Sequence, residues 1–455
     1  MKVSKYITMV EQMNGDRLVH SGLSGAVLNV ARKDLPEFEL LLNGESPDTG
    51  DPLVTMAYET VLSALRRSLF LIDDNIDELD LLRSRYYRSK HSCTFTSLSI
   101  APTMKCNLAC PYCYNPRDKP MTMDRETIDR TVTFVGDHLK MSRDTGTPLG
   151  ITWIGGEPLA AFGAMTELAE RIRVIALEHG RDIVGSLVTN GTLLTEDTAA
   201  RLGGRPYFVR NVQITVDGPQ AKHDASRCFP KKGPTYDRIC KGIRLAKKHG
   251  LTVMVRINAD AFFEIKDFER LMDEMYRRGV VETGGHTPSF YLARIHSHAH
   301  DTCKRLRTED RVLSVKDYAT LLVDTVRLAR KRRFPCVLRT FQEPRRIGCG
   351  VVQENGFTVD PEGRLGKCWH AVGSEEYCVG RVGELLETMN GEYRRWQDYD
   401  PFKNEMCRQC QVLPLCMGGC AEAHMRVGGM IDEPCIPEKH NLREALLLRY
   451  GRNGG

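Results

Sequence analysis

The chain has 455 residues, of which 41% are apolar and 27% are charged, with a formal net charge of +5. This is the composition of a globular protein, and the length predicts two or three domains. There is no run of about 18 apolar residues and no apolar signal-peptide stretch at the start, so we expect neither a membrane span nor export. The small positive charge, spread over this length, does not indicate a nucleic-acid partner.

Sixteen cysteines stand out in this composition. In a small secreted protein they would suggest disulfides, but in a large chain without an export signal they suggest free thiols, because the cytoplasm keeps thiols reduced. Clustered cysteines in such a protein are typical of metal or iron–sulfur ligation. We therefore expect a cytoplasmic protein.

Residues 1–95 form the first predicted region. Its stretch 71–82 alternates leucines with acidic residues, which predicts short amphipathic helices and an α-rich region. Residues 44–52 are rich in glycine, proline and aspartate, which predicts a loop. The acidic face is either ordinary solvated surface or a docking surface.

Residues 96–300 alternate short β-rich runs with helical patterns. The predicted strands are 98–102, 150–154, 185–189, 212–216, 252–258 and 290–292. The predicted helices are 125–140, 165–178, 196–202, 236–248 and 265–278. This alternation predicts parallel βαβ units, and six repeats are too few for a closed eight-stranded barrel. The expected fold class is α/β, with a partial (β/α)6 TIM-like barrel.

Residues 301–345 are expected to form a helical connector with one strong helix at 316–333. Residues 346–455 hold eight of the sixteen cysteines and show little periodicity. That composition predicts a small domain stabilised by metal rather than by a large apolar core.

Cys106, Cys110 and Cys113 lie directly after the first predicted barrel strand. Each iron of a cubane cluster normally takes one thiolate, so three cysteines would leave one iron open. The alternatives are buried apolar cysteines or a partial zinc site. The spacing resembles the CxxxCxxC signature of radical S-adenosylmethionine (SAM) enzymes, with Tyr112 as the aromatic residue before the last cysteine. The resemblance implies that the open iron binds SAM and that one electron cleaves it to a 5′-deoxyadenosyl radical.

Further motifs at predicted strand ends extend the resemblance. Gly155-Gly156-Glu157-Pro158 is similar to the GGEP motif, in which backbone and carboxylate receive the SAM amino group. The segment 223–227 is similar to an HDxxR stretch, whose arginine offers a bidentate fork to a carboxylate. The alternatives are that Asn190-Gly191 is a simple turn and that Arg227 is a surface cation. The SAM-binding residues implied are Tyr112, Gly155, Gly156, Glu157, Thr189, Asn190, Arg227 and Asn258.

A second cysteine array resembles the SPASM domain. Its elements are Cys349, then Gly363 and Cys368, then Cys407-x2-Cys410-x5-Cys416-x3-Cys420, and Cys435. The resemblance implies one four-thiolate site at Cys407, Cys410, Cys416 and Cys435. It implies a second site at Cys349, Cys368 and Cys420, completed by Cys336 or Cys378 or left open. Zinc is the competing metal. With the first motif, three [4Fe-4S] clusters are expected, one binding SAM and two auxiliary.

Taken together, the motifs imply a radical SAM peptide maturase that oxidatively closes a thioether or carbon–carbon crosslink in a ribosomally made precursor peptide. A flavodoxin- or ferredoxin-type protein would supply electrons, and residues 1–95 are a candidate precursor-docking region. No catalytic acid or base is assigned.

The sequence leaves three alternative functions open. The first is a sulfatase-type formylglycine maturase, disfavoured because Trp369 and His370 follow Cys368 where that type carries an aspartate. The second is a peptide epimerase. The third is a non-enzymatic iron–sulfur scaffold, which would need no SAM pocket.

Overall fold

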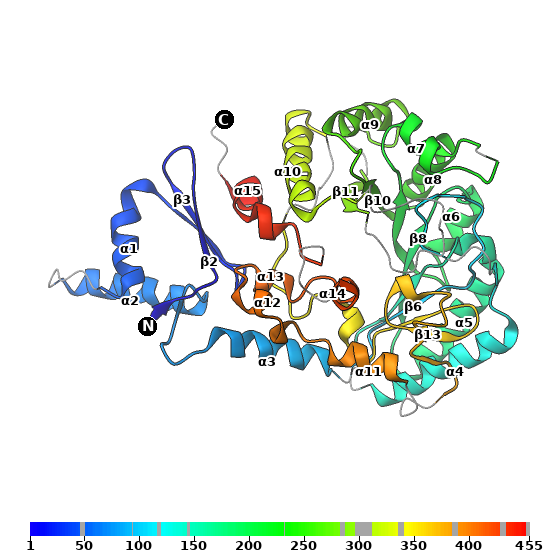
Figure 1. Cartoon of the computed structure of the whole chain (residues 1–455), viewed down its shortest axis with the longest axis horizontal. Coiled ribbons are helices and arrows are strands. Elements are labelled where there is room, and N and C mark those ends of the chain that lie inside the picture. The colour runs from blue at the N-terminus through cyan, green and yellow to red at the C-terminus, as the bar shows by residue number, and fades with distance from the viewer. Residues whose placement is uncertain are drawn as a thin grey trace.

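The computed structural model describes residues 1–45, 51–92, 94–115, 120–142, 146–231, 233–282, 287–295, 312–334, 341–384, 390–427 and 434–451. Figure 1 shows the N-terminal region at one end of the molecule and the barrel at the other, with the C-terminal segment between them. A hydrophobic cluster containing Val10, Leu18, Val412 and Leu446 joins the N-terminal sheet to this middle segment.

Six parallel strands form the barrel sheet, in chain order from β6 to β11. They are β6 (Ser97–Ile100), β7 (Leu149–Trp153), β8 (Ile183–Thr189), β9 (Val209–Thr215), β10 (Thr252–Ala259) and β11 (Ser289–Arg294). Each predicted strand is confirmed to within three residues at both ends. The partial (β/α)6 barrel predicted from the alternating pattern is therefore correct.

Helices follow the strands as predicted, again to within three residues. They are α4 (Arg125–Met141), α5 (Phe162–Glu178), α6 (Glu196–Leu202), α8 (Tyr236–Lys248) and α9 (Ile265–Arg277). A further helix, α7 (Gln220–Ser226), was not predicted; a single one of its seven residues, His223, is buried, so the segment shows no apolar helical period. The connector helix is confirmed as α10 (Val315–Lys331).

The strands present two chemically different faces. On β10, Val253, Val255 and Ile257 are buried in the hydrophobic core that the strands share with the helices. Arg256 and Asn258 alternate with them and therefore lie on the opposite face of the sheet. The barrel interior thus carries polar side chains on its carboxyl-terminal side.

The C-terminal region continues the same sheet. β12 (Phe357–Val359) pairs in parallel with β6, and β13 (Arg364–Gly366) and β14 (Gly380–Arg381) follow in antiparallel order. Helices complete this region at α11 (Gly391–Asp398), α12 (Glu405–Gln409), α13 (Leu413–Cys416), α14 (Ala421–Val427) and α15 (Glu438–Tyr450). The described sheet therefore has nine strands where the sequence predicted six.

The N-terminal region contains a sheet as well as helices. β2 (Ile7–Glu11), β3 (Arg17–Ser21) and β4 (Val27–Val30) form an antiparallel sheet, followed by α1 (Leu35–Asn43), α2 (Pro52–Arg67) and α3 (Glu78–Lys90). Short strands β1 (Lys2–Val3) and β5 (Leu71–Ile72) pair with each other. The prediction of an α-rich region omitted these strands, and the helix expected from residue 71 begins at Glu78. Residues 46–50 of the predicted loop lie outside the described residues.

Helix α3 connects the N-terminal and C-terminal regions, as Figure 1 shows along one side of the molecule. The Tyr87 hydroxyl donates to Asp400 Oδ2 at 2.7 Å, and Lys90 Nζ donates to the Tyr399 carbonyl at 2.9 Å. Among the helices of the described ranges, none combines the length and hydrophobicity that crossing a bilayer requires.

Candidate functional site

The three cysteines of the first motif lie in the loop that follows β6. Cys110 is buried, and its carbonyl accepts a hydrogen bond from the Cys113 amide at 3.2 Å. Cys106 Sγ accepts from the Leu108 amide at 3.4 Å, and the Ala109 amide donates to the Cys228 carbonyl at 2.8 Å. The loop is therefore folded back on itself and tied to the segment after α7.

Burial and mutual repulsion disfavour thiolates at this site. Burial raises the pKa of Cys106, and it raises the pKa of Cys110 to about 12. Each of these thiols also interacts electrostatically with Cys113, while Arg227 opposes the rise. A cationic metal centre would remove this penalty, because it deprotonates thiols that coordinate it. Three soft donors sharing one partly buried loop fit an iron–sulfur cluster.

Within the described ranges, no three His, Cys, Asp or Glu side chains gather closely enough to hold a single metal ion. A cubane makes a different demand, since each thiolate binds its own iron and the sulfurs need not converge on one point.

Gly155 and Gly156, after β7, let the cysteine loop approach this strand end. A Cβ on Gly155, whose φ is +128°, would lie 2.3 Å from the Thr103 carbonyl oxygen. A Cβ on Gly156 would lie 2.4 Å from the carbonyl oxygens of both Met104 and Lys105. Real side chains cannot occupy that space. The glycines thus serve the packing of the loop, which the sequence did not predict.

Glu157 is completely buried and joins the ends of β7 and β8. Its Oε2 accepts from the Asn190 amide at 2.7 Å, and its Oε1 accepts from the Thr189 hydroxyl at 2.8 Å and the Leu159 amide at 3.1 Å. Burial raises the pKa of this carboxyl, and the three donors oppose the rise. Both oxygens are therefore occupied by groups of the chain itself.

Asn190 connects the end of β8 to the cysteine loop. Its Nδ2 donates to Asn107 Oδ1 at 2.8 Å and lies 3.9 Å from Cys106 Sγ. Its Oδ1 accepts from the amide and the hydroxyl of Thr192, at 2.9 and 2.6 Å. Thr189 and Asn190 thus lie at the strand end beside the first cysteine, and hydrogen bonds to other residues of the chain hold their side chains in place.

Tyr112, Arg227 and Asn258 converge on Asp217, which is not one of the eight individual SAM-binding residues that the resemblance implied. The Tyr112 hydroxyl donates to Asp217 Oδ2 and accepts from Arg227 Nη1 at 2.8 Å. Asn258 Nδ2 donates to Asp217 Oδ1 at 3.1 Å, and Arg256 Nε donates to Asn258 Oδ1 at 2.9 Å. The sequence position of Asp217 could have identified it, because it directly follows the fourth predicted barrel strand, residues 212–216.

Beside this network lies a cavity of about 230 Å³, lined in part by Tyr112, Asp217, Ser226 and Asn258.

The residues of the motif around α7 have two roles: His223 and Asp224 support the helix, and Arg227 offers a buried donor. His223 Nδ1 accepts from the Asp217 amide at 3.1 Å, and Asp224 Oδ1 accepts from the amides of Thr235 and Tyr236. These two residues hold α7 against the start of α8. Arg227 differs, because its Nε is buried and has no hydrogen-bond partner among the residues that the structure describes. A buried donor of this kind fits a bound carboxylate.

Seven of the eight C-terminal cysteines fall into two groups. Cys416 interacts electrostatically with Cys435, Cys407 and Cys410, and burial raises its pKa to about 12. Cys368 interacts with Cys420 and Cys349. These are the two sets implied by the resemblance, and their cluster ligation stays a prediction.

The fourth ligand of the second set is not identified. Cys378 Sγ donates to the Gly380 carbonyl at 3.0 Å, and its electrostatic neighbours include no cysteine. Cys336 lies outside the described residues. Glu422, which was not predicted, is an electrostatic neighbour of Cys368 and Cys420.

Aromatic residues bridge the two cysteine regions. Tyr114 is an electrostatic neighbour of Cys113 and Cys368, and its ring meets that of His370 edge-on, with centroids 4.6 Å apart. Trp369 Nε1 donates to Ser99 Oγ at 2.9 Å, so the residue after Cys368 is anchored on β6.

Comparisons with known proteins agree with this geometry. The family model described as the Radical SAM superfamily matches residues 100–295. A serine-type anaerobic sulfatase-maturating enzyme of Klebsiella aerogenes is 25% identical over 344 residues, covering 71% of this chain and 78% of the relative.

Two solved structures share the fold at low sequence identity. Native anSMEcpe with bound AdoMet matches with a TM-score of 0.58 and 19% identity, covering 78% of this chain and 97% of that one. Streptococcus suis SuiB bound to precursor peptide SuiA matches with a TM-score of 0.53 and 13% identity, covering 96% and 98%.

Proposed function

Because residues 100–295 form a radical SAM domain, we propose that this enzyme binds SAM beside a [4Fe-4S] cluster held by Cys106, Cys110 and Cys113 and oxidatively modifies a peptide. The observation that carries the proposal is the placement of the three-cysteine loop, with Cys110 buried, next to the Tyr112–Asp217–Arg227 network. When bound, the cluster and SAM supply a 5′-deoxyadenosyl radical that abstracts a hydrogen atom from the substrate.

The chain's own residues bind and orient SAM in this proposal. Arg227 offers a buried Nε, unpartnered among the described residues, to the SAM carboxylate. Tyr112 and Asn258 fix Arg227 and Asp217 in place, because all four share one hydrogen-bond network. The remaining proposed contacts are at Gly155, Gly156, Thr189 and Asn190. Glu157 holds the ends of β7 and β8 together, since both of its oxygens accept from the chain.

The C-terminal cysteines are proposed to hold two auxiliary [4Fe-4S] clusters. Their separation into a four-member and a three-member set supports this number. Tyr114 and His370 fill the space between the second set and Cys113. A net two-electron oxidation of the substrate needs an acceptor for the second electron, and iron–sulfur centres cover a wide range of potentials.

A precursor peptide is the proposed substrate. Support comes from SuiB, which was solved with a precursor peptide and matches 96% of this chain. Residues 1–95 are proposed to contribute to docking, residues 96–300 to hold SAM, residues 301–345 to connect, and residues 346–455 to hold the auxiliary clusters. A flavodoxin- or ferredoxin-type donor in the cytoplasm is proposed to supply electrons.

Two reactions remain as candidates. The first is closure of a thioether or carbon–carbon crosslink. It is favoured by Trp369, which occupies the position where a sulfatase-type maturase carries an aspartate base and whose indole is hydrogen-bonded to Ser99. Conversion of a cysteine or serine to formylglycine is the second, favoured by the 25% identity to a sulfatase-maturating enzyme.

Anaerobic turnover of the reconstituted enzyme with SAM and dithionite tests the proposal. We expect 5′-deoxyadenosine from the wild type and none from Cys113→Ala. Mass spectrometry of a peptide encoded beside the enzyme's own gene then separates the reactions. Loss of two hydrogens without hydrazine reactivity indicates a crosslink, whereas a hydrazine-reactive aldehyde indicates formylglycine. A peptide mass that is unchanged after turnover in H2O but raised by deuterium uptake after turnover in D2O indicates epimerisation. A wild-type enzyme that produces no 5′-deoxyadenosine refutes the proposal.

A further inference from the structure

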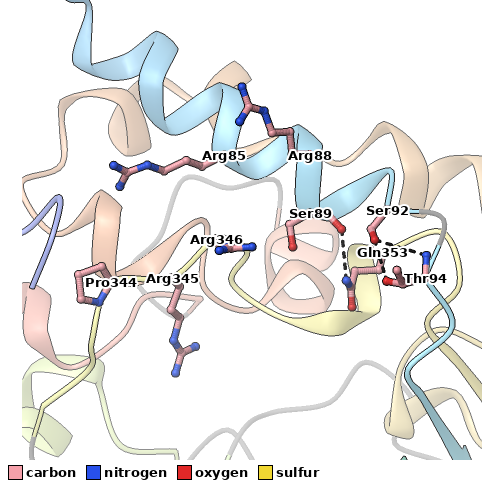
Figure 2. Close-up of a pocket in the computed structure, with 9 residues that line it drawn as sticks. All are labelled: Arg85, Arg88, Ser89, Ser92, Thr94, Pro344, Arg345, Arg346 and Gln353. Atoms are coloured by element: carbon pink, nitrogen blue, oxygen red, sulfur yellow. Dashed lines mark hydrogen bonds between the residues drawn. The ribbon is translucent and has the colours of Figure 1, made fainter. Parts of the chain in front are cut away.

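A basic cavity lies outside the radical SAM site, between α3 and the segment that precedes β12. Its volume is about 650 Å³. Figure 2 shows Arg85 and Arg88 on α3, with Arg345 and Arg346 on the facing segment. Arg85 and Arg88 are three residues apart on one helix and therefore lie on the same face.

Within the described part of the chain, none of these four arginines makes an ion pair. The buried Glu438 carboxylate interacts electrostatically with Arg345 but does not form an ion pair with it. Arg85 Nη1 donates to the Leu23 carbonyl at 2.7 Å, and Arg345 Nη1 donates to the Gly348 carbonyl at 3.1 Å. Burial, and then the like charge of Arg346, lower the pKa of Arg85. Arg88 and Arg346 are exposed, and neither guanidinium donates a hydrogen bond to another residue of the described ranges.

The rest of the lining adds hydrogen-bonding groups and no acid. Ser92 Oγ and Thr94 Oγ1 lie 2.7 Å apart, and Gln353 Nε2 donates to the Ser89 carbonyl at 3.2 Å. Figure 2 shows these polar residues together at one end of the cavity. A cavity with four guanidinium groups and no carboxylate suits a ligand with several negative charges.

Both walls of the cavity are fixed before any ligand arrives. Besides the Tyr87 and Lys90 bonds from α3, His91 Nδ1 contacts Glu354 Oε1 at 2.7 Å. On the other wall, the Arg345 amide donates to the Pro414 carbonyl at 2.9 Å. Preorganised walls reduce the entropy lost on binding.

The cavity is separated from the reaction site along β6. Thr94 precedes this strand, whereas Cys106, Cys110 and Cys113 follow it. The two sites therefore lie toward opposite ends of the same strand. A ligand in the cavity would be held away from the reacting atoms.

We propose that this four-arginine cavity docks an acidic segment of the peptide substrate, remote from the residue that is modified. The inference rests on the proposed function for the peptide nature of the ligand. Carboxylates along one peptide segment would pair with guanidinium groups on both walls, which a single small anion cannot do.

Binding of fluorescein-labelled hexaglutamate to the full-length, cluster-loaded enzyme tests the proposal by anisotropy. We expect hexaglutamate to bind, more weakly at high salt, and hexaglutamine not to bind. The double variant Arg88→Glu/Arg346→Glu should weaken hexaglutamate binding by about tenfold or more, because attraction becomes repulsion. The double variant Arg210→Glu/Lys241→Glu, with the same change in charge at two exposed positions elsewhere, should bind as the wild type does.

A milder pair of substitutions and two further measurements complete the test. If the charge reversal disturbs folding, Arg88→Gln/Arg346→Gln removes the charges more mildly and should still weaken binding. Equal binding of both peptides, or equal loss in both double variants, overturns the proposal. Binding of inorganic phosphate without hexaglutamate also overturns it and makes the cavity a phosphate site. Formation of 5′-deoxyadenosine without peptide is measured in parallel. If the enzyme binds hexaglutamate but forms no 5′-deoxyadenosine, the proposed function alone is refuted. If it forms 5′-deoxyadenosine but does not bind hexaglutamate, the docking site alone is refuted.

Discussion

Arg227 Nη1 donates a 2.8 Å hydrogen bond to the phenolic oxygen of Tyr112, and this bond joins the end of α7 to the cysteine loop. The same hydroxyl donates to Asp217, so Tyr112 connects the partly buried Arg227 guanidinium to a buried carboxylate. Two residues that the sequence suggested separately as cofactor contacts thus form one structural unit.

Tyr112→Phe is expected to destabilise the protein by about 1–3 kcal/mol, because it leaves Arg227 and Asp217 each short of a buried partner. SAM binding should also weaken, since Arg227 loses its orientation. Calorimetry and SAM titration of the cluster's absorbance measure the two effects. Tyr450→Phe removes an exposed hydroxyl and serves as the control, with a change within about 0.5 kcal/mol. Equal effects of both variants would contradict the prediction.

Gly156→Ala is expected to impair cluster assembly and lower stability by about 2 kcal/mol or more, because its Cβ would meet two carbonyl oxygens at 2.4 Å. The backbone atoms it meets belong to the cysteine loop and cannot swing aside like a side chain. Gly163→Ala is the matched control, since its Cβ meets nothing within 4 Å at the start of α5. Alanine there should be neutral or slightly stabilising. Iron content and Tm measure both variants.

Cys407→Ala should lower the iron content by about four atoms per chain, because it removes a ligand of the proposed four-thiolate site. Cys378→Ala should leave the iron content unchanged, since this thiol donates to the Gly380 carbonyl and has no cysteine among its electrostatic neighbours. Colorimetric iron assay of anaerobically purified protein distinguishes the two. An iron loss in Cys378→Ala as large as in Cys407→Ala would identify Cys378 as a ligand.

His20→Leu should remove an acid-sensitive part of the stability. His20 on β3 is 1% exposed, packs edge-on against Phe341, and burial lowers its pKa from 6.5 to about 4. The neutral ring is favoured in the fold, so this contribution is present above pH 6.5 and is lost as the pH falls toward 4. It amounts to about 3 kcal/mol over the whole range. The Tm of the wild type should therefore fall more steeply than that of His20→Leu between neutral and mildly acidic pH. Parallel pH profiles would contradict this.

The barrel could be predicted from sequence because its signals are local. The pattern of β10, with Val253, Val255 and Ile257 on one face, repeats every second residue, and the helices that follow have caps such as Asp124. The cysteine spacing could also be recognised in the sequence, because all three cysteines of the first motif lie in one loop.

The missing parts depend on contacts between distant residues. β12 has three residues, too few for a pattern, and exists because β6 offers it a partner. The role of Asp217 depends on its neighbours in the fold. Tyr112 is far from Asp217 in the sequence, and Arg227 lies on another element, at the end of α7. The four-arginine cavity likewise joins α3 to a segment some 260 residues away, as the Gln353–Ser89 bond shows.

The parallel pairing of β12 with β6 has a consequence for protein engineering. A cut near residue 345 would not release two self-sufficient modules, since it would expose a row of unpaired amides and carbonyls along β6. Such a bare edge recruits other chains and promotes aggregation. Chimaeras that borrow the cysteine-rich tail from a relative must therefore transplant a compatible strand and its register with it.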